Sequence, residues 1–478
     1  MGDIISGRGE KMSRYYRSRR QSGKIKILIL SLLLVVGVGL GIKYYKPGDI
    51  VRKVSDESIV KSKPLNLPIK EIEAPKSKIK AYWFNDNTNP IISISFIFKN
   101  AGYAGEDLKK QGISKLVAAL LVEGAGDFTA DELKEELEMR AITIAFNSGK
   151  DDFEGELLTT KDNLDKAVYF LRLMLTEPKF EIDGVKRVKL QMLEALKRQK
   201  EQPANELRLI FAQELYGNHP YARNPLGKKE DIENISVGDL KSFVNNSFSK
   251  SNLVIGIAGD ISESEARTLI DDVFGRLPDT GKINFVRKAD IKFDGRLRRV
   301  ERDSSQNIWL AALPSVDRKH ADFYPLFVAN YVWGGAGLTS KLSQNIRENE
   351  GLTYGIYSYQ LLDDKAPLLM VSFSATKDNF DKAKKIWESE TRKFNKNGIS
   401  DKELQKAKDY LISSYNLRFA SIVNIAKILS SMQKYNLGLD FLQKRNEYIS
   451  NISIKEVNNV IKKYINPQNT VEAEIGKF

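Results

Sequence analysis

Hydrophobic and polar residues follow two different periodicities along most of the chain. The segment ISISFIFKN (92–100) is apolar and rich in β-branched and aromatic residues, a composition typical of a strand. The segment GISKLVAALLVEG (112–124) instead repeats apolar residues every three or four positions, which places them on one face of a helix. These apolar positions are Ile113, Leu116, Val117, Leu120 and Leu121. The two patterns predict a buried helix packed against a sheet.

Strand and helix patterns continue to alternate beyond this pair. Residues 130–140 are predicted to form an amphipathic helix, and residues 141–158 a pair of strands. Two further long helices are expected at 162–176 and 184–200. Because both types of element are present throughout, the pattern predicts an α+β fold.

An internal repeat divides the chain. The motif TKDNLDKA (160–167) recurs as TKDNFDKA at 376–383, and each copy follows an extended segment and opens a long helix. The repeat predicts two tandem homologous halves, at 76–275 and 297–478, joined by a linker at 276–296.

The N-terminal region has a different character. Residues 27–42 contain no charged side chain, and Tyr44 and Tyr45 follow them as an interfacial pair, so we expect a transmembrane signal anchor at 27–45. A cleaved signal peptide is the alternative. The basic tail at 1–26 predicts a cytoplasmic N-terminus. The proline-containing segment 46–75 is expected to be a linker or a strand-like arm. The chain would then cross the inner (plasma) membrane once, with its C-terminal body facing the periplasm or the outside.

Composition and charge exclude several classes of protein. The chain of 478 residues contains no cysteine and only two histidines, His219 and His320, which excludes disulfides and thiolate metal sites and disfavours any site that needs several imidazoles. Most of the net charge of +13 belongs to residues 1–26 and 43–80, which carry +6 and +5. The rest of the chain is nearly neutral, so we expect no nucleic-acid partner.

Several segments carry a resemblance to a known family. Residues 304–358 contain a glycine-rich turn, a following helix and the sequence RENEGLTY, and this block resembles the pitrilysin, insulinase and mitochondrial processing peptidase family. The first half is similar to the same family at 99–125, 216–236 and 258–262. The resemblance covers most of 76–478. It implies that each half is a mixed, mostly antiparallel sheet covered by helices.

The resemblance also implies that the catalytic motif has been lost. Active members of the family carry H-x-x-E-H on the helix that aligns with 112–124 and bind zinc through it. The aligned positions here are Lys115, Ala118 and Ala119, and the third ligand position falls on Ala195. Without lone pairs at these positions we expect no catalytic residue and no metal or other cofactor in this chain, with zinc only in a partner subunit.

Four other residues are candidates to replace the lost motif. Lys115 could serve as an amine base or replace the charge of the metal, although a solvated lysine on a helix is far commoner. Glu194 lies next to Ala195, and His219 and His320 could meet in space as ligands. Each of these residues is expected to have an ordinary surface or loop role.

Arg347 and Tyr354 are the substrate-binding candidates. A helix is expected at 338–349 and a strand in LTYGIYSY, which puts Arg347 at a helix end and Tyr354 on the strand that leaves it. In the family, an arginine and a tyrosine at these places bind the peptide near the zinc site. The alternative is structural: an arginine that caps carbonyls and a tyrosine that packs in a strand.

These observations favour a membrane-anchored, degenerate metallopeptidase homologue that is not active alone. It would pair with a catalytic homologue as a heterodimer, or form a homodimer, and help to bind an extended peptide. One alternative is a structural or assembly subunit of a membrane complex with no peptide cleft in use. The other is a peptidase with a non-standard site, which the loss of the zinc positions disfavours.

Overall fold

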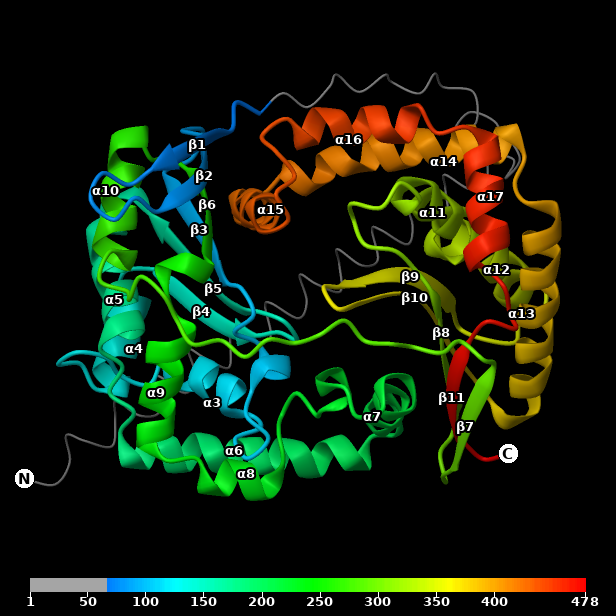
Figure 1. Ribbon diagram of the computed structural model, residues 1–478, viewed down its shortest axis with the longest axis horizontal. Coiled ribbons are helices and arrows are strands. Elements are labelled where there is room, and N and C mark those ends of the chain that lie inside the picture. The colour runs from blue at the N-terminus through cyan, green and yellow to red at the C-terminus, as the bar shows by residue number, and fades with distance from the viewer. Residues whose placement is uncertain (1–66) are drawn as a thin grey trace, which may run out of the picture. The chain divides into compact units, whose positions relative to one another are not determined.

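The computed structural model describes residues 67–478, which contain two β-sheets, each covered by helices (Figure 1). The first sheet comprises β1 (Lys70–Glu73), β2 (Lys80–Asn85), β3 (Ile91–Phe98), β4 (Thr143–Ser148), β5 (Phe153–Thr160) and β6 (Leu253–Gly259). The second comprises β7 (Arg296–Glu301), β8 (Asn307–Pro314), β9 (Ile356–Asp363), β10 (Ala366–Ala375) and β11 (Val471–Gly476). Residues 278–295, which contain no helix or strand, connect the two halves.

The two sheets have the same strand order. The first runs β1-β2-β6-β3-β5-β4 and the second β7-β11-β8-β10-β9, so the second repeats the first without β1. All neighbours are antiparallel except β2 with β6 and β7 with β11, which are parallel in both sheets. The edge strands β4 and β9 therefore occupy equivalent places, and each is joined by a hairpin to its neighbour.

Helices follow the strands of each half. The first half contains α3 (Ile113–Leu120), α4 (Ala130–Met139), α5 (Leu164–Thr176), α6 (Ile182–Glu201), α7 (Pro203–Tyr216), α8 (Lys229–Asn234), α9 (Val237–Ser247) and α10 (Glu263–Phe274). The second contains α11 (Phe323–Asn330), α12 (Lys341–Ser343), α13 (Lys377–Asn397), α14 (Asp401–Ser413), α15 (Ile422–Lys434), α16 (Phe441–Ser450) and α17 (Ile454–Tyr464). Helices α4, α9, α10, α14 and α17 begin with a capping box, because a serine or threonine stands three residues before an acidic one.

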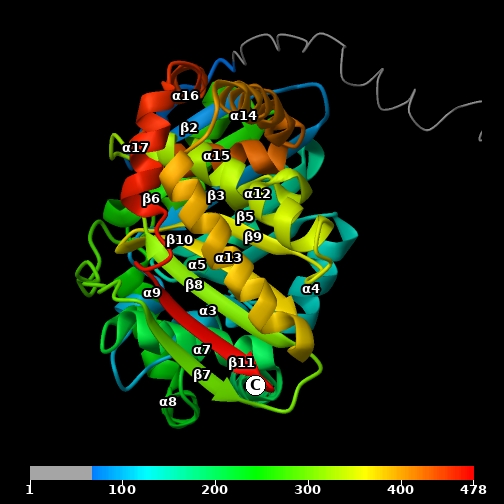
Figure 2. The ribbon, with the colours of Figure 1, turned by 90° about the vertical axis from the view of Figure 1, so that its right-hand side faces the viewer.

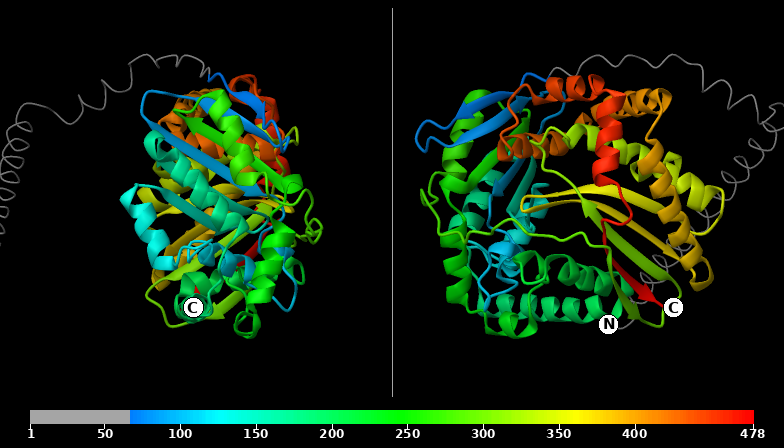
Figure 3. Two further views of the ribbon diagram at one scale, coloured as in Figure 1. Left: turned by 90° about the vertical axis from the view of Figure 1, so that its left-hand side faces the viewer. Right: turned by 45° about the vertical axis from the view of Figure 1, so that its right-hand side comes forward.

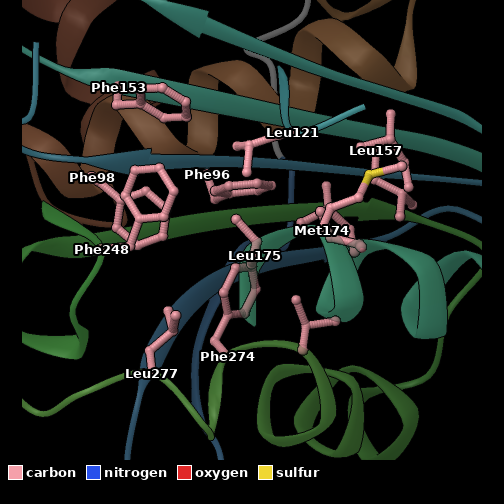
Figure 4. Close-up of a cluster of buried hydrophobic side chains, with 14 of the residues drawn as sticks. Phe96, Phe98, Leu121, Phe153, Leu157, Met174, Leu175, Phe248, Phe274 and Leu277 are labelled. Carbon is pink, nitrogen blue, oxygen red and sulfur yellow. The ribbon is translucent and has the colours of Figure 1, made fainter. Parts of the chain in front are cut away.

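The outer face of each sheet is covered by helices of its own half. In the first half, Phe96 and Phe98 of β3 pack against Phe274 and Phe248, with ring centroids 5.2 Å and 4.4 Å apart (Figure 4). In the second half, Trp309 of β8 packs against Trp387 of α13 at 4.5 Å, and Figure 2 shows α13 lying across this sheet. Both clusters are fully buried and form the two principal cores.

The inner face of each sheet is covered by a helix from the other half. Helix α15 packs on β6 and β3, and α7 packs on β11 and β8, so that the two helices lie between the sheets (Figures 1 and 3). Leu429 and Met432 of α15 are buried against Tyr82 and Phe84 of the first sheet. Leu207, Phe211 and Leu215 of α7 are buried with residues of β10 and β11 in the same way. The halves thus exchange one helix each.

The tips of the β4–β5 and β9–β10 hairpins meet between the halves. Lys150 forms an ion pair with Asp363, and the backbone N–H of Asp364 donates to Asp151 over 3.1 Å. Lys434, at the end of α15, contacts the carboxylates of Asp152 and Asp364. Although burial acts to lower it, these carboxylates raise the pKa of Lys434. This paired charge cluster joins segments far apart in the sequence, and a pair of this kind is costly to break because the remaining charge stays buried.

The structure confirms the predicted α+β class with two helix-covered sheets. The predicted transmembrane segment at 27–45, with the tail at 1–26 and most of the linker at 46–75, lies outside the described residues. Within residues 67–478, no helix is both long and apolar enough to cross a bilayer.

Candidate functional site

Helix α3 carries three of the four positions where the sequence predicted a lost zinc motif. It begins after Gly112, whose φ of 94° allows the sharp turn that a residue with a side chain would resist. The helix packs against β4, α6 and α9. Because α6 carries Ala195, the structure brings the helices of all four predicted positions into contact. The local scaffold expected for the motif is therefore present.

The side chains at these positions cannot bind zinc. Ala118 is buried, Ala119 is exposed and Ala195 is half-buried on α6, and a methyl group offers no lone pair. The Lys115 ammonium donates a hydrogen bond to Oδ1 of Asn147 on β4 over 2.9 Å. Burial lowers the pKa of Lys115. Lys115 thus contacts the edge strand β4 instead of acting as a metal ligand.

The remaining metal candidates do not converge either. Glu194 is exposed on α6. His219 lies beside Tyr221, with Nδ1 accepting from the Tyr221 N–H and Nε2 near the Arg287 carbonyl, and both ring nitrogens are therefore occupied locally. His320 caps the turn before α11 by accepting from the Asp322 N–H. Among residues 67–478 no group of three or more histidine and acidic side chains is arranged to hold a metal ion.

Glu106 is a buried carboxyl at the start of α3 that the sequence did not single out. Its Oε2 accepts from the Gly112 N–H over 2.7 Å, and its Oε1 accepts from the Ser114 N–H over 2.8 Å and from the Ser114 hydroxyl over 2.5 Å. Burial outweighs these hydrogen bonds and raises the pKa of Glu106 to about 7. Glu106 caps the N-terminus of α3 from a loop seven residues before the helix begins, and this spacing matches no local capping motif.

Arg347 and Tyr354 lie on either side of a tight turn in the second half. Arg347 belongs to a π-helical turn (Gln344–Glu348), and its guanidinium donates to the Glu348 carboxylate over 2.7 Å. The Tyr354 side chain is 82% exposed and makes no hydrogen bond within residues 67–478. Within residues 67–478, the Arg347 side chain donates to no helix-end carbonyl, and Tyr354 lies before the strand rather than in it.

Two local expectations around these residues were wrong. The helix expected at 338–349 begins only at Lys341, because Ser340 accepts from the Ser343 N–H as its N-cap, and Leu338 is left exposed in a preceding 3-10 turn. Tyr354 precedes the strand, which begins at Ile356. The Thr353 hydroxyl accepts from the Gly355 N–H over 3.1 Å and lies 2.6 Å from the Ser374 carbonyl, and these contacts hold residues 353–355 in a turn.

Comparison with known proteins places the chain among peptidase-like sequences. The family described as "Peptidase M16 inactive domain" matches residues 234–411. A "Non-peptidase homolog YmxG" of Helicobacter pylori is 28% identical over 399 residues, covering 82% of this chain and 90% of that protein. An "Uncharacterized zinc protease YmxG" of Bacillus subtilis is 21% identical over 337 residues, covering 70% of this chain and 81% of that protein.

A solved structure shows the same architecture. The crystal structure of a peptidase M16 inactive domain from Pseudomonas fluorescens superposes with a TM-score of 0.80 at 25% identity, covering 86% of this chain and 99% of that one. The similarity therefore extends over both halves and includes the helices that carry the four zinc-motif positions.

Proposed function

This chain is a homologue of the M16 peptidases, and from that premise we propose that it is the inactive member of a membrane-anchored pair. In this pair a homologous subunit with an intact zinc motif hydrolyses a peptide, and the present chain helps to bind it. The names of the matched family and of the Helicobacter relative support a catalytically inactive homologue. The observation that carries the proposal is that α3 and α6 keep the motif's scaffold while Lys115 and the three alanines supply no metal ligand.

Arg347 and Tyr354 support a role in peptide binding. The only ion pair of Arg347 within the described residues is with its exposed neighbour Glu348, and such surface pairs contribute little to stability. The Tyr354 hydroxyl is free to donate to a carbonyl oxygen. Both side chains can therefore bind an extended backbone without loss of an internal contact.

The test begins with the full-length protein purified from its own membranes. We expect an M16 homologue carrying H-x-x-E-H to copurify, and elemental analysis of the complex to find zinc in that subunit alone. Arg347→Ala and Tyr354→Phe should leave the complex assembled and lower its peptidase kcat/KM. We expect about a ten- to a hundredfold loss for the arginine, since a hydrogen bond to a charged group contributes roughly 1.5 to 3 kcal/mol, and about a two- to tenfold loss for the neutral tyrosine.

Matched controls are available on the same chain. Arg392→Ala on α13 and Tyr410→Phe on α14 change exposed residues of the same types, and neither should affect activity. Equal activity of the Arg347 and Tyr354 variants and the wild-type complex would leave an assembly role as the better description. Zinc bound stoichiometrically by this chain alone would contradict the proposal that it is the inactive member.

The proposal includes an orientation in the membrane. The basic tail at 1–26 is placed in the cytoplasm and the body in the periplasm or outside, because positive charge flanking an apolar segment is retained inside. Protease added to spheroplasts should digest the body and spare a tag fused to the N-terminus. Digestion of the tag with survival of the body would reverse the orientation.

A further inference from the structure

The second half contains a cavity of about 560 Å³ to which nothing above assigns a role. It lies between α11, β9, α15 and α16, and the short 3-10 helix Ser414–Phe419 contributes to its wall. A volume of this size is typical of small-molecule sites in proteins. Neither Arg347 nor Tyr354 lines it, so the cavity is separate from the proposed peptide-binding residues.

Three arginines line this cavity: Arg445 is buried, Arg318 is half-buried and Arg418 is exposed. Arg445 of α16 is only 7% exposed, and its guanidinium carbon lies 3.7 Å from the ring centroid of Tyr415. Arg418 approaches the same ring at 5.8 Å. The charges of Arg445, Arg418 and Arg318 all act to lower the pKa of Tyr415, although burial raises it on balance. Arg445 and Arg418 therefore lie close to one aromatic side chain, and Arg318 lines the same cavity.

The positive charge of these arginines is not neutralised by the protein. No aspartate or glutamate lies among the described residues that line the cavity, and within residues 67–478 none of the three arginines forms an ion pair. Arg445 donates only to the Leu411 carbonyl and the Asn446 side chain, and Nε of Arg318 is buried without a partner. A fourth cation, Lys427, is paired with Glu156 over 2.7 Å. Burying an arginine without a counter-charge is unfavourable, and an anion in the cavity would offset this cost.

A polar group with unused hydrogen-bonding capacity lines the same cavity. The amide nitrogen and oxygen of Gln360, on β9, are buried and have no hydrogen-bond partner within residues 67–478. Such a pair of atoms is rare in a folded protein and marks a place where a ligand or water completes the hydrogen bonding. The amide can donate to one oxygen of an anion while the arginines bind the other.

Much of the remaining wall is aromatic or apolar, although Asn330, Ser358 and Ser431 also line it. Phe323, Tyr324 and Phe327 of α11 face Phe441 of α16 and Met432 of α15. Aromatic rings of this kind bury an apolar body, and guanidinium groups recognise carboxylates by paired hydrogen bonds. We propose that this cavity binds an organic carboxylate, held by Arg318, Arg418 and Arg445, whose apolar body packs against the aromatic side chains.

The carboxylate has two possible sources with the same chemistry: a free small molecule or the C-terminus of a peptide that ends in an apolar residue. N-acetylphenylalanine serves as the first probe and an acetylated hexapeptide ending in phenylalanine as the second. Each is paired with its C-terminal amide, which keeps the shape and removes the charge. Binding to the full-length protein in detergent is measured by calorimetry.

We expect at least one of the carboxylates to bind about tenfold or more tightly than its amide, because the amide loses the charge-assisted hydrogen bonds. Binding of both carboxylates indicates a small-molecule site, and binding of the hexapeptide alone indicates a peptide terminus. Arg318→Gln with Arg418→Gln should abolish the preference for the carboxylate. Neither the Arg318 nor the Arg418 side chain makes a hydrogen bond within the described residues, so the double variant should still fold.

Two further variants separate a loss of binding from a loss of folding. Arg445→Lys keeps the buried charge but loses the guanidinium fork, and it should weaken carboxylate binding about tenfold or more. Arg392→Gln, on α13 outside the cavity, should leave binding unchanged. Equal affinity for carboxylate and amide, no binding of either probe, or an unchanged preference in the Arg318 and Arg418 variant would overturn the proposal. Because the readout is binding, these outcomes are independent of the partner's peptidase activity.

Discussion

The buried carboxyl of Glu106 couples the start of α3 to pH. Its oxygens accept hydrogen bonds from Gly112 and Ser114, and the Ser114 hydroxyl in turn accepts from Ser148 on β4 over 2.7 Å. Burial nevertheless raises the pKa of Glu106 from 4.5 to about 7. The folded protein therefore binds this proton more tightly than the unfolded chain does.

The pKa difference at Glu106 predicts a pH-dependent stability. Between about pH 4.5 and 7 the folded state holds more protons at this site, so its contribution to the free energy of unfolding is greatest at low pH and falls as pH rises through 7. The full change is about 3 kcal/mol. Urea unfolding at pH 5 and pH 8 should show this component in the wild type and not in Glu106→Gln. Glu138→Gln, an exposed substitution on α4, is the control, and the prediction fails if both variants keep the wild-type pH slope.

The sequence was informative about single residues where the chemistry is local. The family resemblance implies that Lys115, Ala118, Ala119 and Ala195 stand at the zinc-ligand positions, and the structure places the two helices that carry them in contact. Glu106 could not be found, because its role depends on burial by the folded chain, in which distant segments meet, as Arg223 does when it donates to the Glu106 carbonyl over 2.7 Å. The hydrogen bond from Lys115 to Asn147 could not be predicted either, because the two residues are far apart in the sequence.

At the scale of elements, the periodicity predicted three of the five expected helices to within two residues at each end, whereas the helix expected within 112–124 ends at Leu120. The helices expected at 130–140 and 184–200 are observed at Ala130–Met139 and Ile182–Glu201. The pattern failed at 338–349, where leucine spacing suggested one continuous helix. A side-chain cap at Ser340 and a switch to π-helical bonding at Gln344 divide this segment, and apolar spacing carries no information about either.

Gly256, in the middle of β6, allows α15 to pack closely on the first sheet. A Cβ atom at this position would lie 2.2 Å from the Ala426 carbonyl oxygen and 2.5 Å from the Ser430 nitrogen. Beside it, the hydroxyls of Ser95 and Ser430 are 3.0 Å apart, and the Ile255 N–H donates to Gln433 over 2.6 Å. A glycine inside a strand commonly marks such a close approach of two backbones.

We therefore predict that Gly256→Ala displaces α15 and lowers the free energy of unfolding by about 1 to 3 kcal/mol or more, as overpacking does in other cores. Thermal melting measures the loss. Gly184→Ala on α6 is the matched control, because its Cβ would meet no atom within 4 Å, and it should stabilise the helix by about 0.5 to 1 kcal/mol. If Gly256→Ala melts at or above the wild-type temperature, the close approach has no energetic consequence.

At the scale of the whole described body, the repeat TKDN(L/F)DKA predicted two similar halves, and the two sheets share one strand order. The exchange of α7 and α15 between the halves could not be predicted, because amphipathic patterns show that a helix has an apolar face and not which sheet covers it. The charge cluster around Lys434 could not be predicted either, because its members come from segments far apart in the sequence.

The exchange of helices predicts that neither half is stable alone. A fragment ending at residue 277 lacks α15, so Tyr82 and Phe84 of its sheet would meet water. A fragment beginning at 278 lacks α7, which covers Leu368 and Met370. Exposure of each face destabilises its fragment in proportion to the apolar area that meets water. This cost is large compared with the small net stability of a folded domain.

We expect each fragment expressed singly to bind a hydrophobic dye and to melt without a cooperative transition, and the two expressed together to assemble and melt cooperatively. The control is a protease site inserted at Phe285, which is 86% exposed in the connecting segment, because cleavage there leaves both exchanged helices in place. The cleaved protein should stay assembled and melt within a few degrees of the intact chain. If the isolated fragments instead unfold cooperatively near the temperature of the whole protein, α7 and α15 are peripheral covers, and the two halves are independent domains held together mainly by the charge cluster around Lys434.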